Sequence, residues 1–206
     1  MRSIYKIVVC SLLTLSITSC EKDLLEKEQY QKEIYLIGAY NRVWTTEVSY
    51  SNEEVKTYFT VSSSGTLALD RDVNVKMKIN EELVDIYNKK YWTVLNEDKY
   101  YKSRDTDLYS IPSLENTVIK HAEGISTEVP VLIKTASLKI DQSYVIPVEI
   151  ESTTGYPVST SGYKMLVLLK LKNEYSGSYQ MSGHTTLEGE TPKTIQKPKT
   201  IKPTGV

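Results

Sequence analysis

The feature that most constrains this chain is a hydrophobic period of two that recurs along most of its length. Residues 73–79, Val-Asn-Val-Lys-Met-Lys-Ile, are the clearest case, with apolar and polar side chains in strict alternation. This alternation predicts a half-buried β-strand, because successive side chains of a strand point to opposite faces of its sheet. Comparable rows or short apolar runs occupy 34–37, 55–61, 117–120, 129–133, 144–150 and 163–171. About seven alternating strands predict an all-β antiparallel sandwich, since buried parallel strands are apolar on both faces.

Two prolines lie inside these predicted strands, Pro130 and Pro147. Proline has no amide hydrogen to donate to a neighbouring strand. We therefore expect both strands to be at a sheet edge, or to be interrupted, at these positions.

One short helix interrupts the strand pattern after residue 79. Asn80 is a good N-cap, Glu81 and Glu82 suit the positive end of a helix, and Lys89 and Lys90 suit its other end. The apolar face of this helix is predicted to consist of Leu83, Ile86 and Tyr87. The polar, tyrosine-rich residues 96–110 are predicted to form a long loop between sheets.

The N-terminus carries a separate signal. Arg2 and Lys6 precede the apolar run 7–17, which has the length of a signal-peptide core and is too short to span a membrane. The run ends in Ile17-Thr18-Ser19-Cys20, the pattern of a bacterial lipobox; an ordinary secretory signal with a chance cysteine is the alternative. We expect residues 1–19 to be a removable signal peptide and Cys20 to carry the lipid that holds the mature chain on a membrane. The charged residues 20–31 are predicted to be the lipidated tether.

Composition excludes several kinds of function. The formal net charge of −1 offers no footprint for nucleic acid. The chain has only two cysteines; Cys10 leaves with the signal peptide and Cys20 is acylated, so no thiol remains for a disulfide or a nucleophile.

Catalytic and cofactor motifs are also missing from the sequence. The two histidines, His121 and His184, are far apart and lie in no nucleophile-type turn, and no glycine-rich loop resembles a phosphate cradle. Glycoside hydrolysis needs two carboxylates across the scissile bond, and no recognisable catalytic run supplies them. The pairs in 70–72 and 105–107 could hold calcium, although a solvated turn is the commoner role. We therefore expect no enzyme activity, cofactor or metal.

Tyrosine is conspicuous, with 16 copies against one phenylalanine. Flat aromatic faces suit sugars, because sugar C–H groups pack on them while the hydroxyls find polar neighbours. The aromatic residues in or beside predicted loops are the candidate glycan contacts: Trp44, Trp92, Tyr100, Tyr101 and Tyr109. The alternative is that they pack against the core or a missing module, as tyrosine often does in sandwiches. By strand phase, Tyr35, Tyr144 and Tyr163 are expected to cap the core.

Several blocks of sequence together resemble a known module. They are 35–43 (Tyr-Leu-Ile-Gly-Ala-Tyr-Asn-Arg-Val), the helix 81–88, and the pair 109–112 and 144–150. This pattern resembles the N-terminal domain of unknown function of Bacteroidetes surface lipoproteins, which is encoded beside glycan-import systems and precedes some glycan-cleaving domains. The resemblance covers 34–171 and implies an immunoglobulin-like β-sandwich for residues 32–173.

The C-terminal residues carry a second resemblance. Residues 175–183 resemble the first strand of the β-rich C-terminal module that usually follows in such proteins. About thirty residues of this composition cannot bury a core alone. Residues 174–206 are therefore predicted to be an incomplete, poorly ordered start of that module, and the chain to be a truncated product.

The resemblance implies a function as well as a fold. It implies a non-catalytic lipoprotein of the outer membrane, on the cell surface or the periplasmic face, which acts as a glycan-binding or spacer module in polysaccharide capture. Its expected partners are the membrane, through the lipid anchor, together with polysaccharide and the lipoproteins of an importer complex. The alternatives are a purely structural docking module and the remnant of a glycan-cleaving enzyme without its catalytic domain.

Overall fold

The computed structural model describes residues 27–103, 106–140, 142–186, 188 and 191–201. The predicted signal peptide and the lipidation site at Cys20 lie outside the described residues. Over this part of the chain, no helix is long and apolar enough to cross a membrane.

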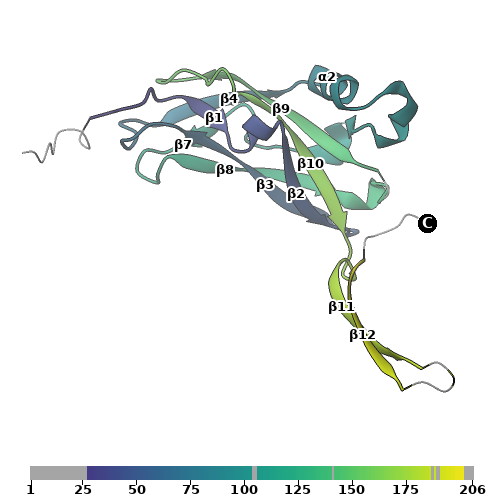
Figure 1. Cartoon of the computed structure of the whole chain (residues 1–206). Helices are drawn as coiled ribbons and strands as arrows, with labels where there is room; N and C mark the ends of the chain where they lie inside the picture. Colours follow the sequence, from purple (N-terminus) through teal and green to yellow (C-terminus); the bar gives the residue numbers. More distant parts are fainter. Residues whose placement is uncertain (1–26, 104–105, 141, 187, 189–190, 202–206) are drawn as a thin grey trace, which may run out of the picture.

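Two sheets form the body of the molecule (Figure 1). The first sheet has the order β1 (Ile34–Leu36), β3 (Glu54–Ser63), β8 (Ser126–Lys134) and β6 (Tyr109–Ser110). The second has the order β2 (Val43–Ser49), β10 (Lys164–Lys172), β9 (Tyr144–Thr153), β4 (Val73–Ile79) and β7 (Thr117–Ile119), with β5 (Lys102–Ser103) also paired to β9. The prediction of an all-β sandwich with one short helix is confirmed.

The core lies between these sheets and follows the predicted alternation. On β4, Val73, Val75 and Met77 are buried while Asn74 and Lys76 are exposed. The inward rows of β3, β8, β9 and β10 join the same apolar cluster. Burial of alternate side chains from both sheets is what holds the two layers together.

Helix α2 (Glu82–Tyr91) covers the outer face of the second sheet (Figure 1). Leu83 and Val84 pack there against Val145 of β9 and Leu166 of β10, and this makes a second, smaller apolar cluster. The central strands β9 and β10 are therefore buried on both faces near α2.

The start of α2 agrees with the sequence in part. The amide of Glu82 donates to Asn80 Oδ1 at 3.1 Å, which is the contact expected of an N-cap side chain. Of the three residues predicted for the apolar face, Leu83 is buried and Tyr87 is partly buried, whereas Ile86 is 53% exposed. The helix instead buries Asn88, whose side-chain amide donates to the Tyr101 carbonyl and accepts from the Tyr101 amide, both at 2.9 Å.

Those two hydrogen bonds fasten the segment that was predicted to be a long loop. Residues 94–110 contain the 3-10 helices η3 (Val94–Lys99) and η4 (Thr106–Leu108) as well as the short strands β5 and β6. A further 3-10 helix, η5 (Thr135–Ser137), follows β8.

The chain changes sheets between β1 and β2. β1 pairs with β3 in the first sheet, whereas β2 runs parallel to β10 at the edge of the second. The crossing passes through Gly38, at φ 90°, and the 3-10 helix η2 (Ala39–Asn41) to Arg42, at φ 63°. Glycine tolerates this left-handed region, but a Cβ on Gly38 would lie 2.6 Å from Trp44 Cε3.

Both strand prolines occupy positions that tolerate them. Pro147 lies on β9 between the stretch that pairs with β5 (Tyr144 and Val145) and the stretch that pairs with β4 (from Val148 onward). Pro130 lies on β8 outside the short pairing with β6. The expectation of a local edge or interruption is confirmed at both.

Beyond the body, β11 (Gly177–Thr185) and β12 (Lys193–Ile201) form a two-stranded antiparallel hairpin. The hairpin extends away from the sandwich, next to the end of β10 (Figure 1). Most of its side chains are exposed.

Candidate functional site

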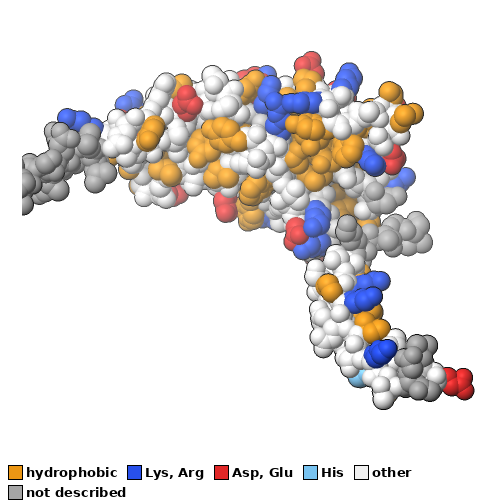
Figure 2. Space-filling model, in the orientation of Figure 1, with side chains coloured by type: hydrophobic (Ala, Val, Ile, Leu, Met, Phe, Trp, Pro, Cys, Tyr) orange, Lys and Arg blue, Asp and Glu red, His pale blue; other side chains and the backbone are white. Residues whose placement is uncertain are grey.

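A groove of about 410 Å³ opens between α2, the crossing segment η2 and the start of β10. Its floor is apolar and buried, and its rim is exposed and carries hydroxyl and basic groups. Figure 2 shows hydrophobic side chains beside Lys and Arg side chains in this region, next to α2. The residues that line the groove are Ala39, Tyr40, Arg42, Leu83, Ile86, Tyr87, Thr160, Ser161, Tyr163, Lys164, Met165 and Leu166.

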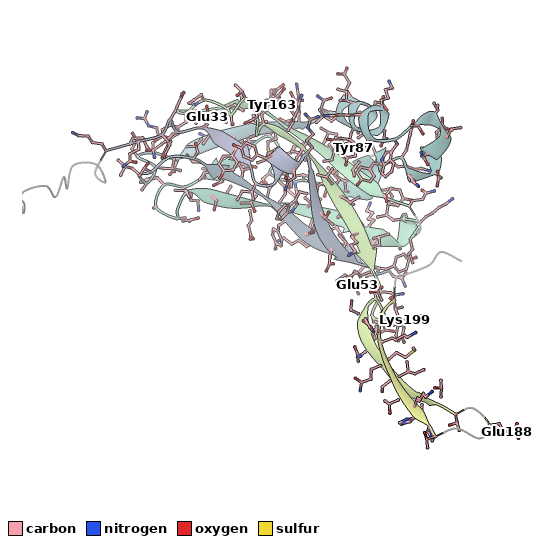
Figure 3. The ribbon with its side chains drawn as sticks, in the orientation of Figure 1. Glu33, Glu53, Tyr87, Tyr163, Glu188 and Lys199 are labelled. Atoms are coloured by element: carbon pink, nitrogen blue, oxygen red, sulfur yellow. The ribbon has the colours of Figure 1, made fainter. Side chains whose placement is uncertain are left out.

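Three tyrosines stand in the wall of this groove. Tyr40 is 64% exposed, while Tyr87 and Tyr163 are half-buried. Figure 3 places Tyr87 and Tyr163 on the side of the sandwich that carries α2, away from Lys199 on the hairpin. The wall therefore offers aromatic surface at an open site, which is the usual composition of a ligand cleft.

Tyr87 is fixed by its aromatic neighbours. Its ring stacks on Tyr101 with centroids 5.1 Å apart and planes 9° apart, and it lies 4.4 Å from the Tyr91 ring. Burial, together with the nearby Tyr101 hydroxyl, raises the pKa of Tyr87 to about 12. The Tyr87 hydroxyl therefore stays neutral at physiological pH.

Two cations belong to the same lining, Arg42 and Lys164. Lys164 Nζ lies 4.9 Å from the centroid of the Tyr163 ring, a cation–π contact. Among the described residues, the lining contains no Asp or Glu, and neither cation forms a salt bridge. The groove is therefore basic as well as aromatic.

The aromatic residues that sequence analysis selected are dispersed. Tyr101 does not line the groove itself, but its ring stacks on Tyr87, which does. Trp44 is 39% exposed on β2, with its ring against Gly38. Trp92 follows α2, and the partly buried Tyr100 follows η3.

Tyr109 cannot serve as a sugar platform. It is 7% exposed and belongs to the main core cluster, and its buried hydroxyl has no hydrogen-bond partner in the described part of the chain. Burial raises its pKa to about 12. The sequence placed Tyr109 in a loop because β6 is only two residues long and carries no recognisable alternation.

The groove also uses residues that the sequence pattern did not single out. Tyr163 was expected to cap the core, and Tyr40 and Arg42 entered only as part of the 35–43 block. The groove combines 39–42, 83–87 and 160–166, which no local spacing brings together. The one available signal was the position of Tyr40 and Arg42 beside Gly38, a residue typical of a chain reversal.

The acidic pairs considered for calcium have other partners. Asp70 is hydrogen-bonded by Arg71 and by the Tyr156 hydroxyl, which hold the pKa of Asp70 well below its usual range. His121 Nδ1 lies 2.6 Å from Asp72 Oδ1. Within the described ranges, no group of three or more His, Cys, Asp or Glu residues could hold a metal. Asp105, of the second pair, lies outside them.

Comparison with known proteins identifies two domains along the sequence. A family model described as an N-terminal domain matches residues 30–157, more than half of the chain. A second model, described as a C-terminal domain, matches residues 163–206. No curated protein matches this sequence.

Solved structures share the fold at low sequence identity. A multidomain Bacteroides ovatus protein that includes DUF1735 is 21% identical (TM-score 0.54; 78% of this chain, 51% of that one). A Bacteroides thetaiotaomicron protein described as an auxiliary nutrient binding protein is 16% identical (TM-score 0.55; 81% and 57%). A B. ovatus protein proposed to bind carbohydrate is 17% identical (TM-score 0.50; 77% and 43%). The present chain thus spans roughly half the length of the structures it matches.

Proposed function

Because this chain belongs to the family whose N-terminal domain model matches residues 30–157, we propose that it is a non-catalytic glycan-binding module. It shares its fold with Bacteroides proteins of unknown function. The observation that carries this proposal is the open groove with Tyr40, Tyr87 and Tyr163 in its wall. Two of the structural neighbours are described in terms of nutrient or carbohydrate binding, and this supports the same class of ligand.

The chemistry of the groove suits a sugar. The exposed Tyr40 ring can pack against the C–H face of a pyranose, while the hydroxyls of Thr160 and Ser161 are hydrogen-bond partners for sugar hydroxyls. The stacked pair of Tyr87 and Tyr101 is held in place before any ligand arrives. A preorganised wall of this kind lowers the entropic cost of binding.

We further propose that a lipid on Cys20 displays the module at the outer membrane, with polysaccharide and importer lipoproteins as its partners. The support is the sequence Ile17-Thr18-Ser19-Cys20 after a short apolar run. Replacing Cys20 by Ala should move the protein from the membrane fraction to the soluble fraction. A C20A protein that stays with the membrane would contradict the anchor.

Binding is tested by affinity electrophoresis of the purified chain in gels that contain defined polysaccharides. Tyr40→Ala and Tyr163→Ala should each weaken retention about tenfold, which corresponds to about 1.4 kcal/mol of binding free energy. Tyr58→Ala is the control, because Tyr58 is also an exposed tyrosine, at 40%, but lies on β3 of the other sheet, outside the groove. Failure of every polysaccharide to retard the chain would favour a spacer or docking role instead.

A further inference from the structure

The groove has more positive charge than binding of a neutral sugar requires. Arg42 and Lys164 both line it, and the described lining has no acidic residue to neutralise them. Unpaired basic groups beside an aromatic wall are suited to a ligand that is itself negatively charged.

The lack of a partner for Lys164 has a structural cause. Its neighbour across the ladder between β10 and β9 is Glu149. The Glu149 carboxylate already accepts a hydrogen bond from the Asn80 side chain and lies 3.7 Å from Lys78 Nζ. Lys164 instead lies over the Tyr163 ring, which leaves its ammonium group available to a ligand.

Arg42 is held at the groove by an unusual backbone conformation. It is the one non-glycine residue of the described chain with a positive φ, at 63°. Two backbone hydrogen bonds maintain this conformation: the Arg42 amide donates to the Ala39 carbonyl, and the Arg42 carbonyl accepts from the Leu166 amide, both at 2.8 Å. Unfavourable backbone conformations persist where the surrounding structure enforces them, and they are enriched at functional sites.

We propose that the groove selects an anionic sugar, whose carboxylate or sulfate group is bound by Arg42 and Lys164 while its ring lies against the tyrosine wall. This inference rests on the proposed glycan-binding function and narrows it to acidic polysaccharides. A planar guanidinium pairs well with either anion, because it presents two parallel N–H donors.

The test compares three probes by affinity electrophoresis and calorimetry: polygalacturonate for carboxylate, dextran sulfate for sulfate, and dextran as the neutral glycan. Arg42→Gly removes the cation and suits the left-handed backbone, so it should fold normally. Lys164→Gln removes the second cation. The matched control is Lys170→Gln, because Lys170 is also an outward lysine of β10 but pairs with Glu47 outside the groove.

At low ionic strength, at least one acidic polymer should bind about tenfold or more tightly than dextran, and the stronger of the two identifies the anion. R42G and K164Q should each lose most of that preference, and K170Q should keep it. If dextran bound as tightly as the acidic polymers, and its binding were unchanged in R42G but weakened in Y163A, the proposed selectivity for acidic sugars would be wrong. The proposed glycan-binding function would still hold. Equal losses in K170Q and K164Q would also overturn the acidic selectivity, because they would indicate nonspecific charge attraction. If no glycan bound, either among these three probes or among the defined polysaccharides of the first test, both the acidic selectivity and the glycan-binding function would be wrong.

Discussion

The sandwich body and the C-terminal hairpin share one sequence pattern but have opposite packing. On β4, alternate residues are fully buried because a second sheet faces them. The hairpin also has two distinct faces. One face carries lysines together with the apolar side chains of Tyr179, Met181, Ile195 and Ile201, while the other carries mainly hydroxyl and amide groups. Tyr179, Met181 and Ile201 are each close to half exposed. Alternation thus specifies a strand and its faces, whereas burial requires an opposing layer.

The largest expected difference between the two regions is in the cost of removing an apolar side chain. Phe59→Ala in β3 should lower the free energy of unfolding by about 3–5 kcal/mol, because Phe59 is 1% exposed and would leave a cavity. Met181→Ala in β11 should change it by less than about 0.5 kcal/mol. Urea denaturation followed by circular dichroism measures both, and similar losses would show that the hairpin face is packed.

The second comparison uses glycines. Gly38→Ala should destabilise the body by about 1–3 kcal/mol, since it adds a left-handed alanine and a clash with the Trp44 ring. Gly183→Ala in the hairpin has no atom within 4 Å of the new Cβ and should be nearly neutral. Thermal unfolding of both variants is the measurement. An unchanged midpoint for G38A would mean that the crossing segment is not held as described.

Removal of the hairpin provides a third comparison. A chain that ends at Asn173 keeps all of β10 and should unfold with nearly the same free energy, within about 0.5 kcal/mol, because isolated hairpins contribute little stability in water. Chemical denaturation of the two lengths of chain decides this. A loss of more than about 1 kcal/mol would indicate that the hairpin supports the body.

The smallest effect concerns the clamp at the start of the body. Glu28 pairs with Lys32 and accepts hydrogen bonds from the Thr66 and Leu67 amides, and these contacts lower the pKa of Glu28 from 4.5 to about 2. A lowered folded-state pKa means that the stabilisation is complete above about pH 4.5 and is lost as the pH falls toward 2. The Thr66 amide resonance should therefore shift across that window.

Two variants sharpen the clamp experiment. Glu28→Gln should abolish the acid-dependent shift of the Thr66 amide, while Glu151→Gln, which breaks a separate surface pair with Lys76, should preserve it. A Thr66 amide that titrates in E28Q would show that another carboxylate controls this loop.

The sequence was sufficient for the parts of the fold that depend on local periodicity. β4 begins and ends where its alternation does, and Pro147 lies at a break in pairing as expected. β2 was missed because only Val48 of its seven residues is buried, which leaves no alternation to detect. The sequence could not show that Ile86, at one side of the apolar face of α2, stays exposed, because the orientation of the helix on the sheet is set by tertiary packing.

The groove could not be predicted in the same way. Its walls come from three segments, the outer two of which are more than a hundred residues apart in the sequence. The role of Arg42 depends on a backbone conformation that its residue type disfavours. Composition drew attention to tyrosine, but the tyrosines that line the groove include Tyr40 and Tyr163, which were not among the candidates chosen from the predicted loops.

The parallel pairing of β2 with β10 has a consequence for how the molecule folds. In this register Trp44 lies beside Val167, so this edge of the second sheet is made by pairing two strands that are far apart in the sequence. Contacts of such high sequence separation close slowly, because the loop entropy is lost before the contacts form. The sandwich cannot be completed until β10 is available.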